Sequence, residues 1–154
     1  MKPLASPFQL SAETRLRVPF HDVDSARVVW HGRYFKYFEL VRSLLLESVG
    51  CSYREMKQSG YLWPIVDAQV RFLKPLILDQ EIRVSARLSE WEYRLVFNYR
   101  VEDEQGRECT RAKTVQVPID AKTLEMQIES PDILLKRIDQ RLAAGDSADD
   151  KNLE

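Results

Sequence analysis

The side chains best suited to chemistry gather between positions 21 and 31 of the sequence. His21, Asp22 and Asp24 lie in a loop-like segment, HDVDSA, and His31 follows shortly after it. A carboxylate just before a helix faces the N–H groups of the first turn, where the helix dipole favours negative charge. Such a carboxylate can act as a base or nucleophile, or it can simply cap a turn. A metal site from His21, Asp24 and His31 is a less favoured alternative, and we predict no bound metal.

The element that positions this stretch is predicted to be a helix over about residues 34–49. Its apolar residues recur every three or four positions, which places them on one face. These residues are Tyr34, Phe38, Val41, Leu45 and Val49. Gly50 can adopt the left-handed conformation that ends a helix. Glu39 and Arg42, three residues apart, are spaced to pair on the helix surface.

Most of the remaining chain alternates apolar and polar residues, as half-buried strands do. Strands are predicted near residues 16–20, 66–72, 82–88, 93–101 and 108–119, of which the last shows no clear inner face. Ser130, Pro131 and Asp132 form a helix start, and that helix is expected to run to about Ala143. The chain is therefore predicted to be α+β, with a five-stranded antiparallel sheet wrapped around one long central helix, plus a C-terminal helix.

The composition is that of one globular domain. The chain has 154 residues and a net charge of −1, which argues against a nucleic-acid partner. No apolar run reaches the ~20 residues of a membrane span, and the N-terminus lacks the pattern of a secretory signal, so a cytoplasmic location is expected. Cys51 and Cys109 are expected to be free thiols. We expect a flexible leader over residues 1–12, the domain over 13–143 and a disordered acidic tail over 144–154.

The segment DVDSARVVWHGRYFKYFELVR resembles the 4-hydroxybenzoyl-CoA thioesterase family of hotdog-fold enzymes, in particular its acyl-CoA thioesterase branch found with Tol–Pal genes. The matching positions are Asp22, Asp24, Val28, Val29, Trp30, His31, Tyr34, Phe38, Glu39 and Arg42. Downstream, VRFLKPLILDQEIRV is similar to the family's strand, Lys-Pro turn, acidic residue and next strand. The likeness covers about residues 13–140 and implies a hotdog fold.

The resemblance implies that Asp24 is the catalytic carboxylate, either as a nucleophile or as the general base for water. It also implies that His31 orients the carbonyl, the water or Asp24. Backbone N–H groups at the helix start would then bind the thioester oxygen. The alternative for His31 is that it lies at the start of the helix and has no catalytic role.

Substrate contacts are expected from six further residues. They are Arg27, Val29, Trp30, Tyr34, Glu39 and Trp63. Arg27 stands where the family usually has Gly, which allows a positive φ; it either meets an anionic group of the substrate or is an ordinary solvated residue. The alternative for Tyr34 and Trp63 is that they are core residues, and the alternative for Glu39 is that it is an ordinary helix residue.

The predicted function is hydrolysis of an acyl-CoA or acyl-carrier-protein thioester to a free acid and a thiol, with no cofactor. Two alternatives remain: a hotdog hydratase or dehydratase acting on acyl thioesters, and a non-catalytic thioester-binding module. One helix covers too little of a five-stranded sheet, its edges and an acyl pocket. We therefore expect a homodimer or homotetramer.

Overall fold

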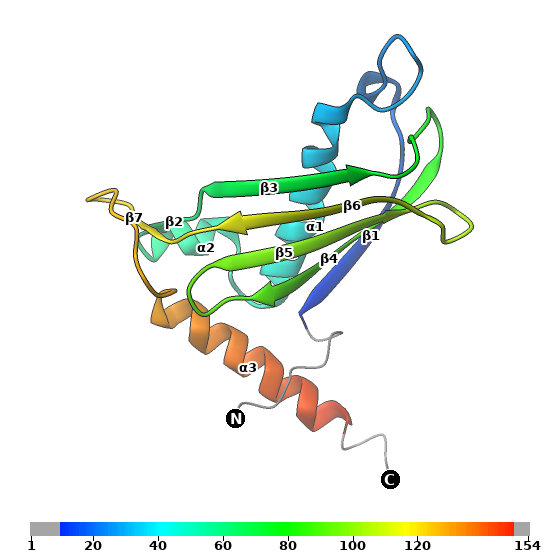
Figure 1. Ribbon diagram of the computed structural model, residues 1–154. Helices are drawn as coiled ribbons and strands as arrows, with labels where there is room; N and C mark the ends of the chain where they lie inside the picture. The colour runs from blue at the N-terminus through cyan, green and yellow to red at the C-terminus, as the bar shows by residue number, and fades with distance from the viewer. Residues whose placement is uncertain (1–9, 150–154) are drawn as a thin grey trace.

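A five-stranded antiparallel sheet packs on the long helix α1 (Tyr34–Ser48) in the computed structural model, which describes residues 10–149 (Figure 1). The strands, in their order across the sheet, are β1 (Ser11–Arg17), β4 (Glu81–Glu90), β5 (Leu95–Glu102), β6 (Glu108–Gln116) and β3 (Ile65–Phe72). The other elements are helix α2 (Tyr53–Gln58), the short strand pair β2 (Tyr61–Leu62) and β7 (Ile119–Asp120), and helix α3 (Asp132–Asp149). The predicted α+β arrangement of sheet, central helix and C-terminal helix is confirmed.

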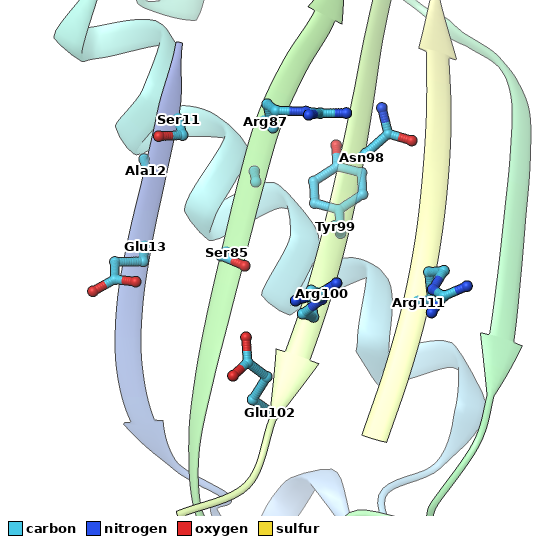
Figure 2. A pocket seen from close by; sticks show the side chains of 11 residues that line it. Ser11, Ala12, Glu13, Ser85, Arg87, Asn98, Tyr99, Arg100, Glu102 and Arg111 are labelled. Atoms are coloured by element: carbon cyan, nitrogen blue, oxygen red, sulfur yellow. The ribbon is translucent and has the colours of Figure 1, made fainter. Parts of the chain in front are cut away.

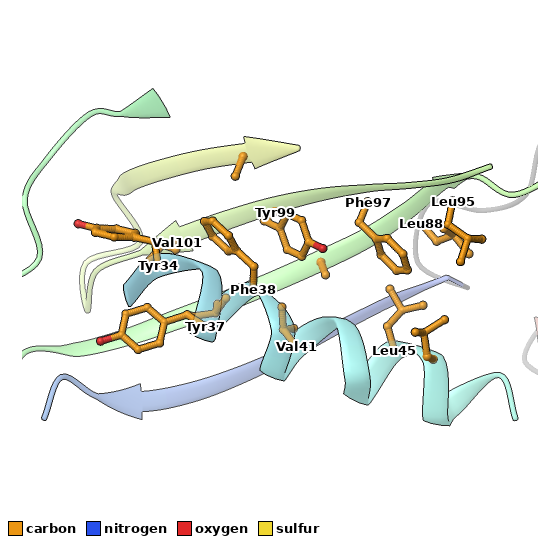
Figure 3. Close-up of a cluster of buried hydrophobic side chains, with 14 of the residues drawn as sticks. Tyr34, Tyr37, Phe38, Val41, Leu45, Leu88, Leu95, Phe97, Tyr99 and Val101 are labelled. Atoms are coloured by element: carbon orange, nitrogen blue, oxygen red, sulfur yellow. The ribbon is translucent and has the colours of Figure 1, made fainter. Parts of the chain in front are cut away.

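Helix α1 buries the apolar face that the sequence predicted. Phe38, Val41 and Leu45 are fully buried, and Figure 3 shows them directed at side chains of β4 and β5. The ring of Phe38 stacks on that of Tyr99, with 4.7 Å between centroids. Burial of each such side chain contributes about 1.5–3 kcal/mol, so this face holds the helix on the sheet. Gly50, at a φ of 72°, terminates the helix in the expected left-handed conformation.

One residue on the buried side of α1 carries a charge. Arg42 donates hydrogen bonds to the hydroxyl of Tyr99, at 3.0 Å, and to the hydroxyl of Tyr53. The Tyr99 hydroxyl also bonds to Thr114 Oγ1 at 2.8 Å. Glu39 points to solvent, and no ion pair within residues 10–149 joins it to Arg42. The expected surface pair is therefore wrong, because Arg42 turns inward to buried hydroxyl groups.

The inner face of β6 is largely polar, which explains why the sequence of this strand shows no clear apolar face. Thr110, Ala112 and Thr114 pair with Val101, Tyr99 and Phe97 of β5, all of which are buried. Thr110 and Thr114 are themselves fully buried. Apolar periodicity alone cannot identify an inner face that consists mainly of hydroxyl groups.

Strand β3 is an exposed edge of the sheet. It pairs only with β6 among the described residues, and Val66 and Phe72 are both more than 45% exposed. The inner face predicted for this strand is not buried in the single chain, because only Val70 is partly buried. Helix α1 packs mainly over β1 and β4 and meets β3 through the rings of Tyr34 and Phe72, 4.8 Å apart between centroids. A long edge strand with exposed apolar side chains is a site for pairing with another chain.

The boundaries of the terminal elements differ from the predicted ones. Strand β1 begins at Ser11, so residues 11–12 belong to the sheet rather than to a leader. Helix α3 continues to Asp149, past the expected end at Ala143, although Gly145 is an unfavourable residue within a helix. Leu10, also in the predicted leader, is buried, and its carbonyl accepts from the Leu88 N–H at 2.9 Å. Residues 1–9 of the predicted leader and 150–154 of the predicted tail lie outside the described residues. No helix within residues 10–149 has the length and apolar character needed to cross a membrane.

Candidate active site

The loop that carries Asp24 is tightly folded on itself. The Asp24 N–H donates to the carbonyl of Val28 at 3.0 Å, and the Arg27 N–H donates to the carbonyl of Asp24 at 2.9 Å. The Asp24 side chain accepts a hydrogen bond from the Ala26 N–H at 2.8 Å. Arg27 has a φ of 63°, so the loop keeps the left-handed conformation at this position although the residue is not glycine.

Asp24 lines an open pocket of about 320 Å³ at the start of α1. Val29, His31 and Tyr34 line the same pocket, so four of the predicted site residues come together. The opposite wall is the last residue of β3 and the turn that follows it. It consists of Phe72, Leu73, Lys74 and Pro75. The predicted carboxylate, the predicted histidine and an apolar wall therefore share one cavity.

Backbone hydrogen bonds fix the loop against this turn and against the helix start. The Val29 N–H donates to the carbonyl of Leu76 at 2.8 Å, and the Trp30 N–H donates to the carbonyl of Asp22 at 3.0 Å. A 3₁₀ turn, His31–Arg33, then runs directly into α1. The first N–H groups of such a turn have no acceptor within it. They lie at the positive end of the helix dipole, which suits an anionic oxygen.

Trp30 supports His31 from outside the pocket. Their rings lie 4.9 Å apart between centroids, and both side chains are exposed. Gly32 follows closely, and a Cβ atom there would approach the Trp30 ring to 2.3 Å. The absence of a side chain at Gly32 is what allows the indole to fold back over this turn. Trp30 thus belongs to the site's surroundings, although it does not line the pocket.

Asp22, the first residue of the Asp-x-Asp pair, is buried, whereas Asp24 is exposed. The Asp22 side chain is completely buried, and Oδ2 accepts a hydrogen bond from the Tyr37 hydroxyl at 2.7 Å. Oδ1 has no hydrogen-bond partner, but the charged groups of Lys36 and Arg33 and the imidazole of His21 lie 3.6–3.8 Å from it. Burial, and then the bond to Asp22, raise the pKa of Tyr37. Asp22 therefore joins the site loop to the first turn of α1.

Three predicted substrate-contact residues lie apart from this pocket. Arg27 and Glu39 are exposed and do not line it. Trp63 lies beyond the far end of α1, in a hollow with Gly50 and Leu134. A helix of 15 residues spans about 22 Å, so within one chain Trp63 is remote from Asp24.

Sequence reasoning gave no role to the turn after β3 or to the Asp22–Tyr37 bond. The Lys-Pro pair in VRFLKPL carried the family likeness, and it marks the pocket wall at Lys74 and Pro75. Tyr37 follows Tyr34 by three positions, which places the two rings on the same side of the helix, 6.2 Å apart. This spacing does not indicate which of the two aspartates accepts a hydrogen bond from Tyr37.

A larger hollow of about 830 Å³ lies on the other face of the sheet (Figure 2). Glu13, Arg87 and Arg100 are among the residues that line it. Arg100 is ion-paired with Glu108 at 3.1 Å, so part of this positive charge is already neutralised. Elsewhere, no group of three or more His, Cys, Asp or Glu side chains within residues 10–149 is placed to hold a metal. The pocket at Asp24 is the better candidate for chemistry.

Both cysteines are free, as expected, and the structure shows that both are buried. Burial raises the pKa of Cys51 to about 11 and also raises the pKa of Cys109. Neither thiol lines the Asp24 pocket. A cysteine nucleophile is therefore not the basis of this site.

The family model described as the thioesterase-like superfamily matches residues 18–142. A 1,4-dihydroxy-2-naphthoyl-CoA hydrolase of Thermosynechococcus vestitus is 32% identical over 101 residues, which are 63% of this chain and 68% of that protein. An Aquifex aeolicus protein described as a candidate esterase is 34% identical over 91 residues, 58% of this chain and 71% of that protein. The structure of a DHNA-CoA thioesterase from Staphylococcus aureus matches with a TM-score of 0.76 at 20% identity and covers 92% of this chain and 95% of that one. The Tol–Pal branch stays a prediction. The chain belongs to the thioesterase-like superfamily and has its hotdog fold.

Proposed function

We propose that this chain hydrolyses acyl-CoA thioesters and that Asp24 is the catalytic carboxylate. The observation that carries the proposal is the shared pocket: Asp24 and His31 line one cavity at the start of α1. The first N–H groups of the turn that leads into α1 belong to His31, which lines the pocket, and to Gly32, whereas the Arg33 N–H donates to the Trp30 carbonyl at 2.9 Å. A carboxylate, an imidazole and backbone donors can together catalyse attack on a thioester carbonyl.

The chemistry of a thioester suits so small a set of groups. The leaving thiol has a pKa near that of cysteine, about 8.5, so it departs with little help from an acid. Asp24 either activates a water or attacks the carbonyl directly. The backbone N–H groups stabilise the oxygen as it gains charge, which is worth about 3–4 kcal/mol for each donor. His31 is placed to orient the water or the carbonyl.

The comparisons support a CoA thioester as the substrate class. The Thermosynechococcus relative is named for hydrolysis of an aromatic acyl-CoA. The exposed base Lys74 lines the pocket of this chain. A positive charge at this position is compatible with the phosphates of CoA.

The protein is proposed to work as a homodimer joined through β3. Strand β3 lacks a neighbour on one side among the described residues and exposes apolar side chains. Pairing with β3 of a second copy would satisfy this edge and continue the sheet. It would also bring Trp63, just before β3, towards the other copy's pocket, since antiparallel pairing sets the start of one strand beside the end of the other. This is the arrangement in which Trp63 could contact substrate.

The test is thiol release from a panel of acyl-CoA and acyl-carrier-protein thioesters by wild type and Asp24→Asn. An asparagine oxygen can still accept the Ala26 N–H bond, so the variant removes the charge and keeps the turn. We expect kcat to fall about 10²–10⁴-fold, as for loss of a general base, with an unchanged circular dichroism spectrum. Asp139→Asn, an exposed position on α3, is the matched control and should be fully active.

Three results would contradict the proposal. Wild-type kcat in Asp24→Asn would remove Asp24 from the chemistry. Loss of enoyl-CoA absorbance without release of thiol would identify a hydratase. Tight binding of acyl-CoA with no turnover of any thioester would identify a binding module.

A further inference from the structure

The segment from Ile119 to Ile128, called here the β7 hairpin, exposes three large apolar side chains. Leu124 is 68% exposed, Met126 is 65% exposed and Ile128 is 82% exposed. Polar residues alternate with them, so the three side chains are presented as a strip. Nothing within the described part of the chain covers this strip. A strip of this kind marks a site for another molecule.

The β7 hairpin is well ordered by its own hydrogen bonds. The Asp120 carboxylate accepts from the N–H groups of Lys122 and Thr123 at 2.8 and 2.9 Å. The Leu124 N–H donates to the carbonyl of Asp120 at 2.8 Å, and Leu124 itself is held at a φ of 61°. These N–H bonds keep the pKa of Asp120 below its usual value. The apolar strip is thus held in one conformation rather than exposed by fraying.

The β7 hairpin is also tied to the beginning of β3. β7 pairs with β2, where Leu62 lies opposite Ile119. The Val117 N–H donates to the carbonyl of Pro64 at 3.3 Å. In Figure 1 the hairpin projects beyond the first residues of β3, while the loop before α1 lies near the other end of that strand. The apolar strip and the Asp24 pocket of one chain are therefore at opposite ends of β3.

Antiparallel pairing of two β3 strands reverses this relation. With the strands paired in full, Ile65 of one copy lies opposite Phe72 of the other. Phe72 begins the wall of the Asp24 pocket. The β7 hairpin of one copy then continues past this point and reaches the turn of Leu73 to Pro75 of the other copy. The apolar strip would meet the apolar wall of a pocket that is open in the single chain.

The charges beside the apolar strip and on the pocket wall also favour a second copy of this chain as the partner. Glu125 and Glu129, beside the apolar strip, are exposed. Lys74, on the wall of the Asp24 pocket, is exposed and basic. Opposite charges at the two surfaces support their alignment when two copies meet.

We propose that the β7 hairpin of each copy closes the Asp24 pocket of a second copy and that Leu124, Met126 and Ile128 set the size of acyl group accepted. The inference rests on the proposed thioester hydrolysis for its substrate and on β3 pairing for its geometry. It goes further by naming the segment that forms the missing wall. An acyl chain in that pocket lies between the hairpin of one copy and Phe72 of the other.

A cross-linking experiment tests the geometry without reference to activity. Cysteine is introduced by Met126→Cys and Leu73→Cys, singly and together, and the protein is treated with a short bismaleimide. β3 has eight residues and is about 27 Å long, so the two new thiols cannot be bridged within one chain. The double variant should give a covalent dimer on a denaturing gel, and each single variant should remain monomeric. No more dimer in the double variant than in the single ones would overturn the inference.

The second arm measures selectivity. Met126→Ser and Leu124→Ser are compared with Lys122→Ser, a polar residue of the same hairpin, on acyl-CoA thioesters of increasing length. We expect kcat/KM for the preferred long or aromatic acyl group to fall at least 10-fold, while acetyl-CoA changes less than 2-fold. An unchanged selectivity profile would overturn the role of the strip. If wild type hydrolyses no thioester, the proposed function fails, and the cross-link still decides the inference.

A third arm separates a membrane surface from a second copy. Wild type and Met126→Ser are sedimented with vesicles of phosphatidylglycerol and phosphatidylcholine. We expect both to stay in the supernatant. Vesicle binding by wild type that Met126→Ser loses, together with no cross-link, would assign the strip to membranes and overturn the proposal.

Discussion

Replacement of Tyr37 by Phe tests whether the buried Asp22 anchors the site loop. The variant removes one hydroxyl and leaves the ring in place, so no large cavity forms. That hydroxyl makes the 2.7 Å hydrogen bond to Asp22 Oδ2, and both residues are at most 3% exposed. A hydrogen bond to a charged group contributes about 1.5–3 kcal/mol. In the variant, the Asp22 carboxylate still has Lys36, Arg33 and His21 at 3.6–3.8 Å. Because these neighbours still partly compensate the carboxylate, we expect a loss in the middle of that energy range.

We therefore expect Tyr37→Phe to lower the free energy of unfolding by about 2 kcal/mol, a roughly 30-fold change in the equilibrium constant. For a chain of this size, Tm should fall by about 4–8 °C. Urea unfolding followed by tryptophan fluorescence, at one fixed protein concentration, measures the difference. Tyr93→Phe, at a position where the ring is exposed, is the matched control and should change stability by less than about 0.5 kcal/mol.

A double-mutant cycle with Asp22→Asn makes the test specific. If the two side chains act through their bond, the effects of Asp22→Asn and Tyr37→Phe should differ from additivity by at least about 1 kcal/mol. Additive effects, or a loss in Tyr37→Phe no larger than that in Tyr93→Phe, would refute the anchoring role of this bond.

Two further predictions concern the loop and the thiols. Arg27→Gly should leave stability unchanged or raise it by up to about 1 kcal/mol, because glycine adopts a φ of 63° without strain. Arg27→Val should lower the free energy of unfolding by about 1–2 kcal/mol, because a β-branched residue is strained at this φ. Thermal unfolding of both variants measures the effect. A lower stability of Arg27→Gly than of wild type would contradict this reasoning and show that the Arg27 side chain itself stabilises the fold. For the thiols, a pKa of about 11 leaves Cys51 protonated at pH 8, so native protein should react slowly with Ellman's reagent and release two equivalents only after unfolding in guanidinium. Rapid modification of one thiol in the native protein would contradict the burial of both.

Periodicity was sufficient to predict the central layers of the fold. The helix over 34–49 and the strands that face it carry apolar residues at the spacing of their own secondary structure. Phe38, Val41 and Leu45 are buried because of that spacing. The same reasoning failed for Arg42, whose charge suggested a surface position. Its burial depends on the hydroxyls of Tyr53 and Tyr99, which come from distant parts of the chain.

The candidate site was predicted in part. The Asp-x-Asp loop, His31 and Tyr34 were identified by residue type and by family likeness, and they do share a pocket. The opposite wall, at Phe72 to Pro75, is separated from Asp24 by about fifty positions, and no local pattern shows that the two segments meet. Trp63 was expected beside the pocket, yet within one chain it lies at the other end of α1.

The sequence by itself determined the secondary structure of the core, the left-handed stop at Gly50 and the presence of two carboxylates before a buried helix. These properties depend on neighbouring residues, which the sequence shows directly. Only the tertiary structure decided that Asp22 is buried against Tyr37 while Asp24, two positions later, faces a pocket. The reason is that solvation of a carboxylate depends on what the rest of the fold places around it. In this chain the first turn of α1 surrounds one aspartate, and the turn after β3 leaves the other exposed in a pocket.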